Sequence, residues 1–268
     1  MKSYRPFRVA SCMAANADSM CRELVQYLAS RLETAVELVE AVSWQERERQ
    51  FDAGEIDLCW ICGLPYVEKI DHGSAIAVAV APVMRAQRYG DAPVYYSDVL
   101  VRSDSSHTRF ADLRGQRWAY NEPRSHSGFN VVRHHLAMLG QSLGYFGEMV
   151  EAGAHQAALR MVLAGEVAGA AIDSTVWEAE ARKDASLREQ VRAIATLGPS
   201  PAPPWVFGAT VPAAVRETVT RCLSAMHLCE RGAQVLGRWA IAELRVVTDG
   251  FYDPIRTMTR DSERLATL

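Results

Sequence analysis

The sequence predicts an α/β protein of two lobes, and three observations carry that prediction. Short apolar runs alternate along the 268 residues with longer segments of helical periodicity, the pattern of strands and helices packed in layers. A Gly-Glu turn leads from a helix into a buried strand twice, at residues 54–60 and 165–171, as expected for two α/β units built alike. A proline-rich stretch at 198–204 has the composition of a stiff extended connector.

Short apolar runs bounded by polar or turn-forming residues define the predicted strands. We expect strands at residues 7–10, 35–39, 56–61, 75–83, 94–101, 117–120, 167–172, 191–195 and 206–210. The longest of these runs is far shorter than the roughly 20 apolar residues of a transmembrane helix, so no membrane insertion is expected.

Apolar residues that recur every three or four positions define the predicted helices. Gly54, Gly140 and Gly165 each follow such a segment, as glycine commonly does where a helix ends. Because strands alternate with helices, the sheets are expected to be largely parallel. The predicted helices are residues 17–32, 44–53, 128–139, 155–164, 175–184, 213–231 and 235–242.

Two passages of the chain between the lobes are expected, one in the apolar strand 94–102 and one in the proline-rich stretch. Two crossings imply a hinge, and a cleft between lobes is a favoured place for a ligand. The last two predicted helices are expected to return to the first lobe. The alternative is one continuous three-layer domain. The expected division is lobe 1 at residues 1–97 plus 206–268 and lobe 2 at residues 98–205.

The composition is that of a folded globular chain, with 49% apolar and 23% charged residues. The formal net charge is −3, and no run of Lys or Arg is longer than two. A nucleic-acid-binding protein normally carries a basic stripe or a strong basic excess. No nucleic-acid partner is therefore expected.

No apolar h-region precedes the first predicted strand, so this sequence shows no secretory signal peptide. We expect a cytoplasmic protein if Met1 is the native start, and a periplasmic protein if a signal peptide has been removed.

Six cysteines stand at irregular spacing, which does not form a disulfide framework in a chain of this length. Cys59-x-x-Cys62 is the one pair with metal-site or redox spacing, but Gly-Leu-Pro follows it and no second Cys-x-x-Cys exists. We expect buried thiols in a reducing compartment, and neither a metal nor a cofactor.

The most specific local signal is Ser125-His126-Ser127-Gly128, between a predicted strand and a predicted helix. Serine is a strong N-cap residue, and Ser127 is the expected cap. Gly128 allows a ligand to approach the backbone closely. Hydroxyls, N–H groups and the positive end of the helix dipole together favour an anion. The alternative is a simple serine cap with a second, spare serine.

An ordered set of motifs from about residue 7 to residue 258 resembles the periplasmic phosphonate-binding family of ABC-transporter substrate-binding proteins. The matching motifs are Gly-Glu-Ile-Asp at 54–57, Tyr95-Tyr96-Ser97, Asp112-Leu113-x-Gly115, Ser125-x-Ser127-Gly128, Gly153-x-His155 and Gly250-Phe251-Tyr252.

The resemblance implies a type II periplasmic-binding-protein fold with a hinged cleft between the lobes. It implies a non-enzymatic solute-binding protein that captures a small phosphorus oxyanion (a phosphonate, phosphate or phosphite-like anion) for an ABC permease. Trp60 and the turn 62–66 would line the lobe opposite the serines. The residues that it places at the ligand are Ser125, His126, Ser127, Gly128, Tyr95, His155, Trp60, Tyr66 and Asp173.

The sequence departs from the family pattern at three positions. His126 stands where threonine is common, and its imidazole would make binding pH-sensitive near neutrality. Ile61 replaces an aromatic residue. Thr175 stands where an acid is expected, which leaves Asp173 as the one nearby carboxylate. An aminoalkyl phosphonate is therefore not the expected ligand.

The alternative function is a cytoplasmic sensor or an enzyme built on the same fold. Ser125 or Ser127, with His155 and Asp173, supplies the residue types of a hydrolytic triad. No nucleophile elbow such as Gly-x-Ser-x-Gly accompanies them.

Overall fold

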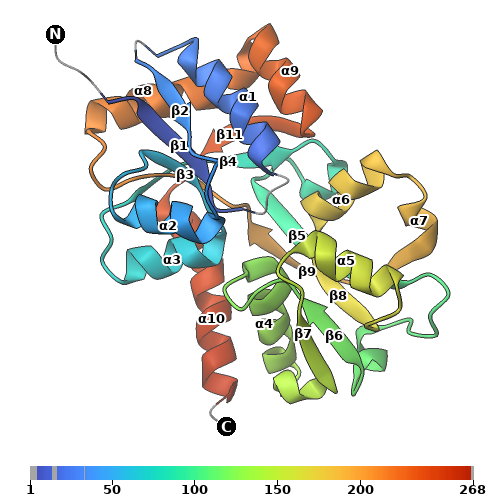
Figure 1. Ribbon diagram of the computed structural model, residues 1–268. Helices are drawn as coiled ribbons and strands as arrows, with labels where there is room; N and C mark the ends of the chain where they lie inside the picture. Colours follow the sequence, from blue (N-terminus) through green and yellow to red (C-terminus); the bar gives the residue numbers. More distant parts are fainter. Residues whose placement is uncertain (1–4, 14–16, 33, 267–268) are drawn as a thin grey trace. The chain divides into compact units, whose positions relative to one another are not determined.

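The structure, a computed structural model, describes residues 5–13, 17–32 and 34–266, and the chain divides into two compact units (Figure 1). Unit 1 comprises residues 1–94 and 202–252, and unit 2 comprises residues 95–201 and 253–268. Each unit is built around its own mixed β-sheet. The predicted α/β fold of two lobes is confirmed, and a single continuous sheet is excluded for the described chain.

The sheet of unit 1 has six strands in the order β11-β4-β10-β3-β1-β2. Strand β1 pairs in parallel with β2 and β3, whereas β10 runs antiparallel to β3 and β4, and β11 antiparallel to β4. The expectation of largely parallel sheets is wrong here, because the two strands contributed after unit 2 enter in the opposite direction. The strands are β1 Phe7–Ser11, β2 Val36–Leu38, β3 Leu58–Trp60, β4 Ala77–Met84, β10 Trp205–Phe207 and β11 Ile241–Val246.

Among its described residues, unit 1 has five α-helices. Ser43 caps α2 by accepting a hydrogen bond from the amide of Glu46 at 3.3 Å. Gly54 adopts a positive φ of 73° after α2, as the predicted C-terminal glycine requires. The expected turn at 62–66 is instead the start of α3. The expected helix 235–242 ends early, and a strand follows. The helices are α1 Asp18–Ala29, α2 Trp44–Asp52, α3 Gly63–Asp71, α8 Ala213–Ser224 and α9 Glu230–Arg238.

The sheet of unit 2 has five strands in the order β7-β6-β8-β5-β9. Strand β6 is parallel to β7 and β8, and β5 is antiparallel to β8. Strand β9 continues into the proline-rich stretch, so only part of that stretch connects the units. The strands are β5 Val94–Arg102, β6 Arg117–Tyr120, β7 Glu148–Glu151, β8 Gly169–Asp173 and β9 Val191–Pro201.

Side chains alternate between two cores on the faces of this sheet, because successive strand residues point to opposite sides. Trp118 packs into one core with α4, and Ala119 into the other with α5. Because β6 and β8 are parallel, their carboxyl ends lie at the same edge of the sheet. The segments that lead into α4 and α6 begin there. The helices are α4 Val131–Met138, α5 His155–Leu163, α6 Ser174–Lys183, α7 Leu187–Gln190 and α10 Asp253–Ala266.

Helix α10 belongs to unit 2, whereas the sequence assigns its residues to lobe 1. The helix packs along α4, where Met258 joins the core and Thr259 Oγ1 accepts a hydrogen bond from Asn130 Nδ2 at 3.1 Å. The crossings lie at 94/95 and 201/202, a few residues before the expected limits. Residues 1–4, 14–16, 33 and 267–268 of the expected lobe 1 lie outside the described residues. In the described part of the chain, no helix has the length and apolar character needed to cross a bilayer.

Candidate functional site

The segment after β6 builds the start of α4 through a π-helical turn, His126–Asn130. Ser125 is the N-cap: its backbone is extended, and its Oγ accepts a hydrogen bond from the amide of Gly128 at 3.1 Å. The expectation that Ser127 caps the helix is wrong, because the wider turn moves the cap back by two residues. The hydroxyl of Ser127 is therefore not used as the cap and bonds to His155 instead.

Ser127, in the turn after β6, contacts His155, which follows β7. Its Oγ lies 2.7 Å from His155 Nε2 and 3.4 Å from Ser125 Oγ. His155 is the first residue of α5, and the amide of Gly153 donates to the carbonyl of Asn121 at 2.7 Å, which ties the two loops together. Burial lowers the pKa of His155 to about 4, so its imidazole is neutral at pH 7. The structure thus brings both serines and His155 to two helix N-termini.

The side chain of His126 faces away from this cluster. It is 0% exposed, its Nε2 lies 2.9 Å from Ser200 Oγ, and its Nδ1 lies 3.1 Å from Asn130 Nδ2. Because the Asn130 amide is a donor, Nδ1 accepts and the Nε2 proton is donated to Ser200. Burial lowers the pKa of His126 to about 3. The expectation that His126 makes binding pH-sensitive near neutrality is therefore wrong. Its side chain forms hydrogen bonds to Ser200 and Asn130 inside unit 2.

Gly128 lies under a side chain that the sequence analysis missed. A Cβ added to Gly128 would lie 2.0 Å from Asn121 Oδ1 and 3.2 Å from His155 Cε1. Asn121 directly follows β6, and its Oδ1 is buried with no hydrogen-bond partner among the described residues. A polar residue immediately after a buried strand was the signal that could have found it.

Tyr95 and Asp173 lie in the same unit. Tyr95 is buried, and its ring and the His126 imidazole lie at an interplanar angle of 71° with 6.5 Å between ring centroids. Asp173 ends β8 and caps α6, where its Oδ1 accepts from the amide and hydroxyl of Thr175 at 2.8 and 2.7 Å. Burial raises the pKa of Asp173 to about 6. Within the described residues no hydrogen bond joins Asp173 to His155, so a Ser-His-Asp triad is not assembled.

Trp60 and Tyr66 belong to unit 1. Trp60 is partly exposed, donates from Nε1 to the carbonyl of Pro203 at 2.9 Å and stacks on Trp205. Tyr66 is buried, and its hydroxyl lies 2.9 Å from Asp249 Oδ1. Tyr66 therefore packs inside unit 1, whereas part of the Trp60 residue stays accessible to solvent.

Ser125, Ser127 and His155 form what we call the serine cluster. It offers hydroxyl, imidazole and backbone N–H donors beside the starts of α4 and α5. Such donors, with the positive ends of two helix dipoles, suit a small oxyanion. In the described part of the chain, no three His, Cys, Asp or Glu side chains converge on a possible metal ion.

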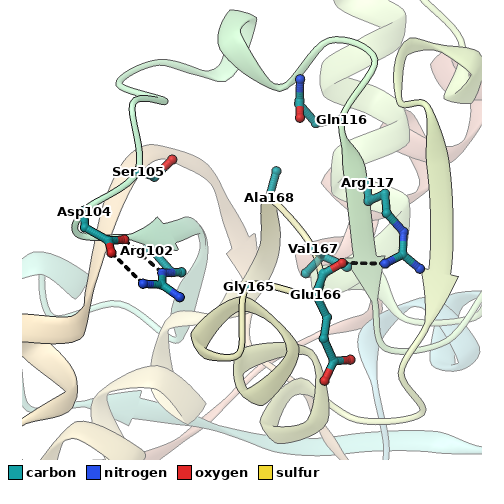
Figure 2. Close-up of a pocket in the computed structure, with 9 residues that line it drawn as sticks. All are labelled: Arg102, Asp104, Ser105, Gln116, Arg117, Gly165, Glu166, Val167 and Ala168. Carbon is teal, nitrogen blue, oxygen red and sulfur yellow. Dashed lines mark hydrogen bonds and ion pairs between the residues drawn. The ribbon is translucent and has the colours of Figure 1, made fainter.

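A pocket of about 380 Å³ lies at the opposite edge of the same sheet, beside the first residues of β6 and β8 (Figure 2). Arg102 pairs with Asp104, and Arg117 pairs with Glu148 and donates to the carbonyl of Glu166. Because carboxylates already neutralise both guanidinium groups, this pocket is a weaker candidate for an anion than the serine cluster.

Comparison with known proteins identifies relatives of the chain. A family model described as the periplasmic substrate-binding protein of a phosphonate ABC transporter matches residues 12–252. A binding-protein component of an ABC phosphonate transporter from Pseudomonas aeruginosa superposes with a TM-score of 0.85 at 15% identity, over 98% of this chain and 88% of that one.

Two further solved structures are similar. A Prochlorococcus marinus protein in complex with methylphosphonate has a TM-score of 0.82 at 14% identity, over 96% of this chain and 98% of that one. The periplasmic aliphatic sulphonate binding protein of Escherichia coli has a TM-score of 0.67 at 16% identity, over 99% of this chain and 89% of that one. At these identities the likeness shows the fold, which is the type II periplasmic-binding-protein fold.

Proposed function

The chain belongs to the family of periplasmic substrate-binding proteins of phosphonate ABC transporters, and on that premise we propose that it captures a small phosphorus oxyanion at the serine cluster of unit 2. The ligand class is a phosphonate, phosphate or phosphite-like anion. The observation that carries the proposal is the contact of Ser127 with His155, which sets a hydroxyl and a neutral imidazole beside two helix starts.

Neutral donors hold the anion in this proposal. Hydrogen bonds to an ionised oxygen are shorter and stronger than neutral ones, and the first amides of a helix have no acceptor within their own helix. The hydroxyls of Ser125 and Ser127 and the first amides of the π-helical turn supply such donors. The absence of a side chain at Gly128 lets Asn121 Oδ1 lie against the backbone of the turn.

His155 orients the hydroxyl of Ser127 in this proposal. For the Ser127 O–H to donate to the anion, the imidazole has to donate from Nε2 to Ser127 Oγ. A neutral imidazole with its proton on Nε2 does so without adding a charge. His155 thereby becomes a positioning residue as well as a ligand neighbour.

We propose that Tyr95 and Asp173 shape the rest of the site in unit 2, and that Trp60 is the ligand-binding residue of unit 1. We further propose that the chain is a binding component rather than an enzyme, and that it delivers its ligand to an ABC permease. The non-enzymatic assignment is supported by His155 Nδ1, which has no hydrogen-bond partner among the described residues, so no carboxylate there orients the imidazole as in a Ser-His-Asp triad.

A thermal-shift and calorimetry panel tests the proposal on the full chain. The arms are methylphosphonate, phosphite, phosphate, sulfate, 2-aminoethylphosphonate and arginine. A ligand at 100 times its Kd stabilises a protein by about 2.7 kcal/mol, so binding is readily detected. We expect a response to at least one phosphorus oxyanion and none to arginine. Tight binding of arginine with no response to any phosphorus oxyanion contradicts the proposal.

A further inference from the structure

Two cysteine thiols of unit 1 lie in contact at the carboxyl ends of neighbouring strands. Cys12 directly follows β1 and Cys59 lies in β3, and their Sγ atoms are 3.4 Å apart. The register explains this contact. Ala10 stands opposite Cys59, and residue 12 shares the face of residue 10. The amide of Cys12 donates to the carbonyl of Trp60 at 2.8 Å, which fixes the backbone beside the pair.

The two thiols differ in access. Cys59 is 0% exposed, and burial raises its pKa well above the ordinary value. Cys12 is partly exposed. Cys12 is therefore the thiol that an oxidant meets first, and Cys59 is the neighbour that can trap the product.

We propose that Cys12 and Cys59 form a reversible oxidation site that hydrogen peroxide or an alkyl hydroperoxide converts to a disulfide. The Cys12 thiolate attacks one peroxide oxygen, an S–O bond forms, the O–O bond breaks, and the leaving oxygen takes up a proton as water or an alcohol. The Cys59 sulfur then attacks the sulfenic sulfur. An S–S bond forms, the S–O bond breaks, and the hydroxide leaves as water with the proton of Cys59.

The geometry favours this pair over the Cys59–Cys62 pair of the sequence motif. A disulfide is about 2.0 Å long, so the Cys12 and Cys59 sulfurs have to approach by about 1.4 Å. Cys62 instead stands at the N-cap of α3, beyond the end of β3. The site lies wholly in unit 1 and does not depend on the proposed ligand.

Peptide mapping of the folded full chain tests the proposal. The protein is treated with equimolar hydrogen peroxide, alkylated and digested with trypsin. Cleavage yields peptide 9–22, which holds Cys12 and Cys21, and peptide 50–69, which holds Cys59 and Cys62. We expect these two peptides to be joined with the loss of two hydrogen atoms, and to separate after reduction with dithiothreitol.

Three variants assign the linkage. Cys62→Ser should keep the joined peptides, whereas Cys12→Ser and Cys59→Ala should lose them. The Cys12 substitution lies at a partly exposed position, so it remains informative even if the buried Cys59 variant fails to fold. Two outcomes overturn the proposal: joined peptides that persist in Cys12→Ser, or a folded wild-type chain whose thiols stay reduced or become sulfinic acids without linkage.

Discussion

Ser127 Oγ and His155 Nε2 lie 2.7 Å apart, although 28 residues separate them in the sequence. The contact joins the turn after β6 to the first residue of α5. Both side chains are buried and the imidazole is neutral, so the hydroxyl is held by a partner that adds no charge. This relationship leads to the first prediction.

Ser127→Ala should weaken the binding of methylphosphonate by roughly 10- to 100-fold, because a hydrogen bond to a charged group contributes about 1.5–3 kcal/mol. The free energy of unfolding should also fall, by about 1–3 kcal/mol, because the variant leaves the buried Nε2 of His155 without its hydrogen-bond partner, although the N-cap at Ser125 stays intact. Isothermal titration calorimetry gives the Kd, and urea unfolding gives the stability.

His134→Ala is the control for this variant. His134 lies on α4 and its Nδ1 is 3.9 Å from Asp261 of α10, outside the serine cluster. The Kd of the His134→Ala variant for methylphosphonate should match that of the unmodified chain. Normal binding by Ser127→Ala would reduce the serine motif to a helix start without a ligand role.

Ser125→Ala should cost about 1 kcal/mol of stability, because it removes the N-cap hydrogen bond to the Gly128 amide. It should also weaken methylphosphonate binding, since the amides of the turn lose their fixed direction. Ser43→Ala is the matched control: it removes the cap of α2 in unit 1 and should lower stability by a similar amount without changing the Kd. Equal binding by both cap variants would contradict the prediction.

The sequence locates the serine cluster because its signals are local. A strand, two serines, a glycine and an apolar periodic segment follow one another, and these patterns place the start of a helix in this segment. The pattern does not reveal the π-helical turn, which needs only one extra residue per turn and leaves no mark in the apolar spacing. The cap was therefore expected at the wrong serine.

Contacts between distant segments lie beyond such patterns. Ser200 of β9 contacts His126 from 74 positions away, and Thr259 of α10 accepts a hydrogen bond from Asn130 across 129 positions. Helix α10 is assigned to the other lobe by sequence order alone, because its periodicity says nothing about which sheet it covers. The Cys12–Cys59 contact likewise depends on the register of β1 and β3, which no local motif records.

Gly128→Ala should weaken methylphosphonate binding, because the new methyl group would overlap Asn121 and press on His155. Overpacking of this kind typically costs about 1–3 kcal/mol of stability.

Asn121→Ala combined with Gly128→Ala removes the overlapping Oδ1 and should recover part of the stability and affinity, which a double-mutant cycle measures. Gly144→Ala is the control, since its nearest contact would be an ordinary 3.5 Å. Additive losses in the double variant would contradict the steric explanation.

Buried histidines should make the chain less stable as the pH falls. Burial lowers the pKa values of His126 and His155 to about 3 and about 4, whereas an unfolded histidine titrates near 6.5. Between those values the unfolded chain binds more protons than the folded one. The free energy of unfolding therefore falls as the pH drops below about 6.5, and each histidine contributes a loss of about 2 kcal/mol at about pH 5.

His126→Gln isolates one of these two contributions. Asp173 acts in the opposite direction, because its raised pKa makes the folded chain take up a proton first, so the whole-chain slope underestimates the histidines. Comparing the variant with the unmodified chain cancels Asp173. Urea unfolding gives the free energy of unfolding at about pH 8 and about pH 5. The decrease between these two pH values should be smaller in the variant than in the unmodified chain by about 2 kcal/mol. Equal losses in the two proteins would mean that His126 takes up its proton inside the folded chain, against its burial between Ser200 and Asn130.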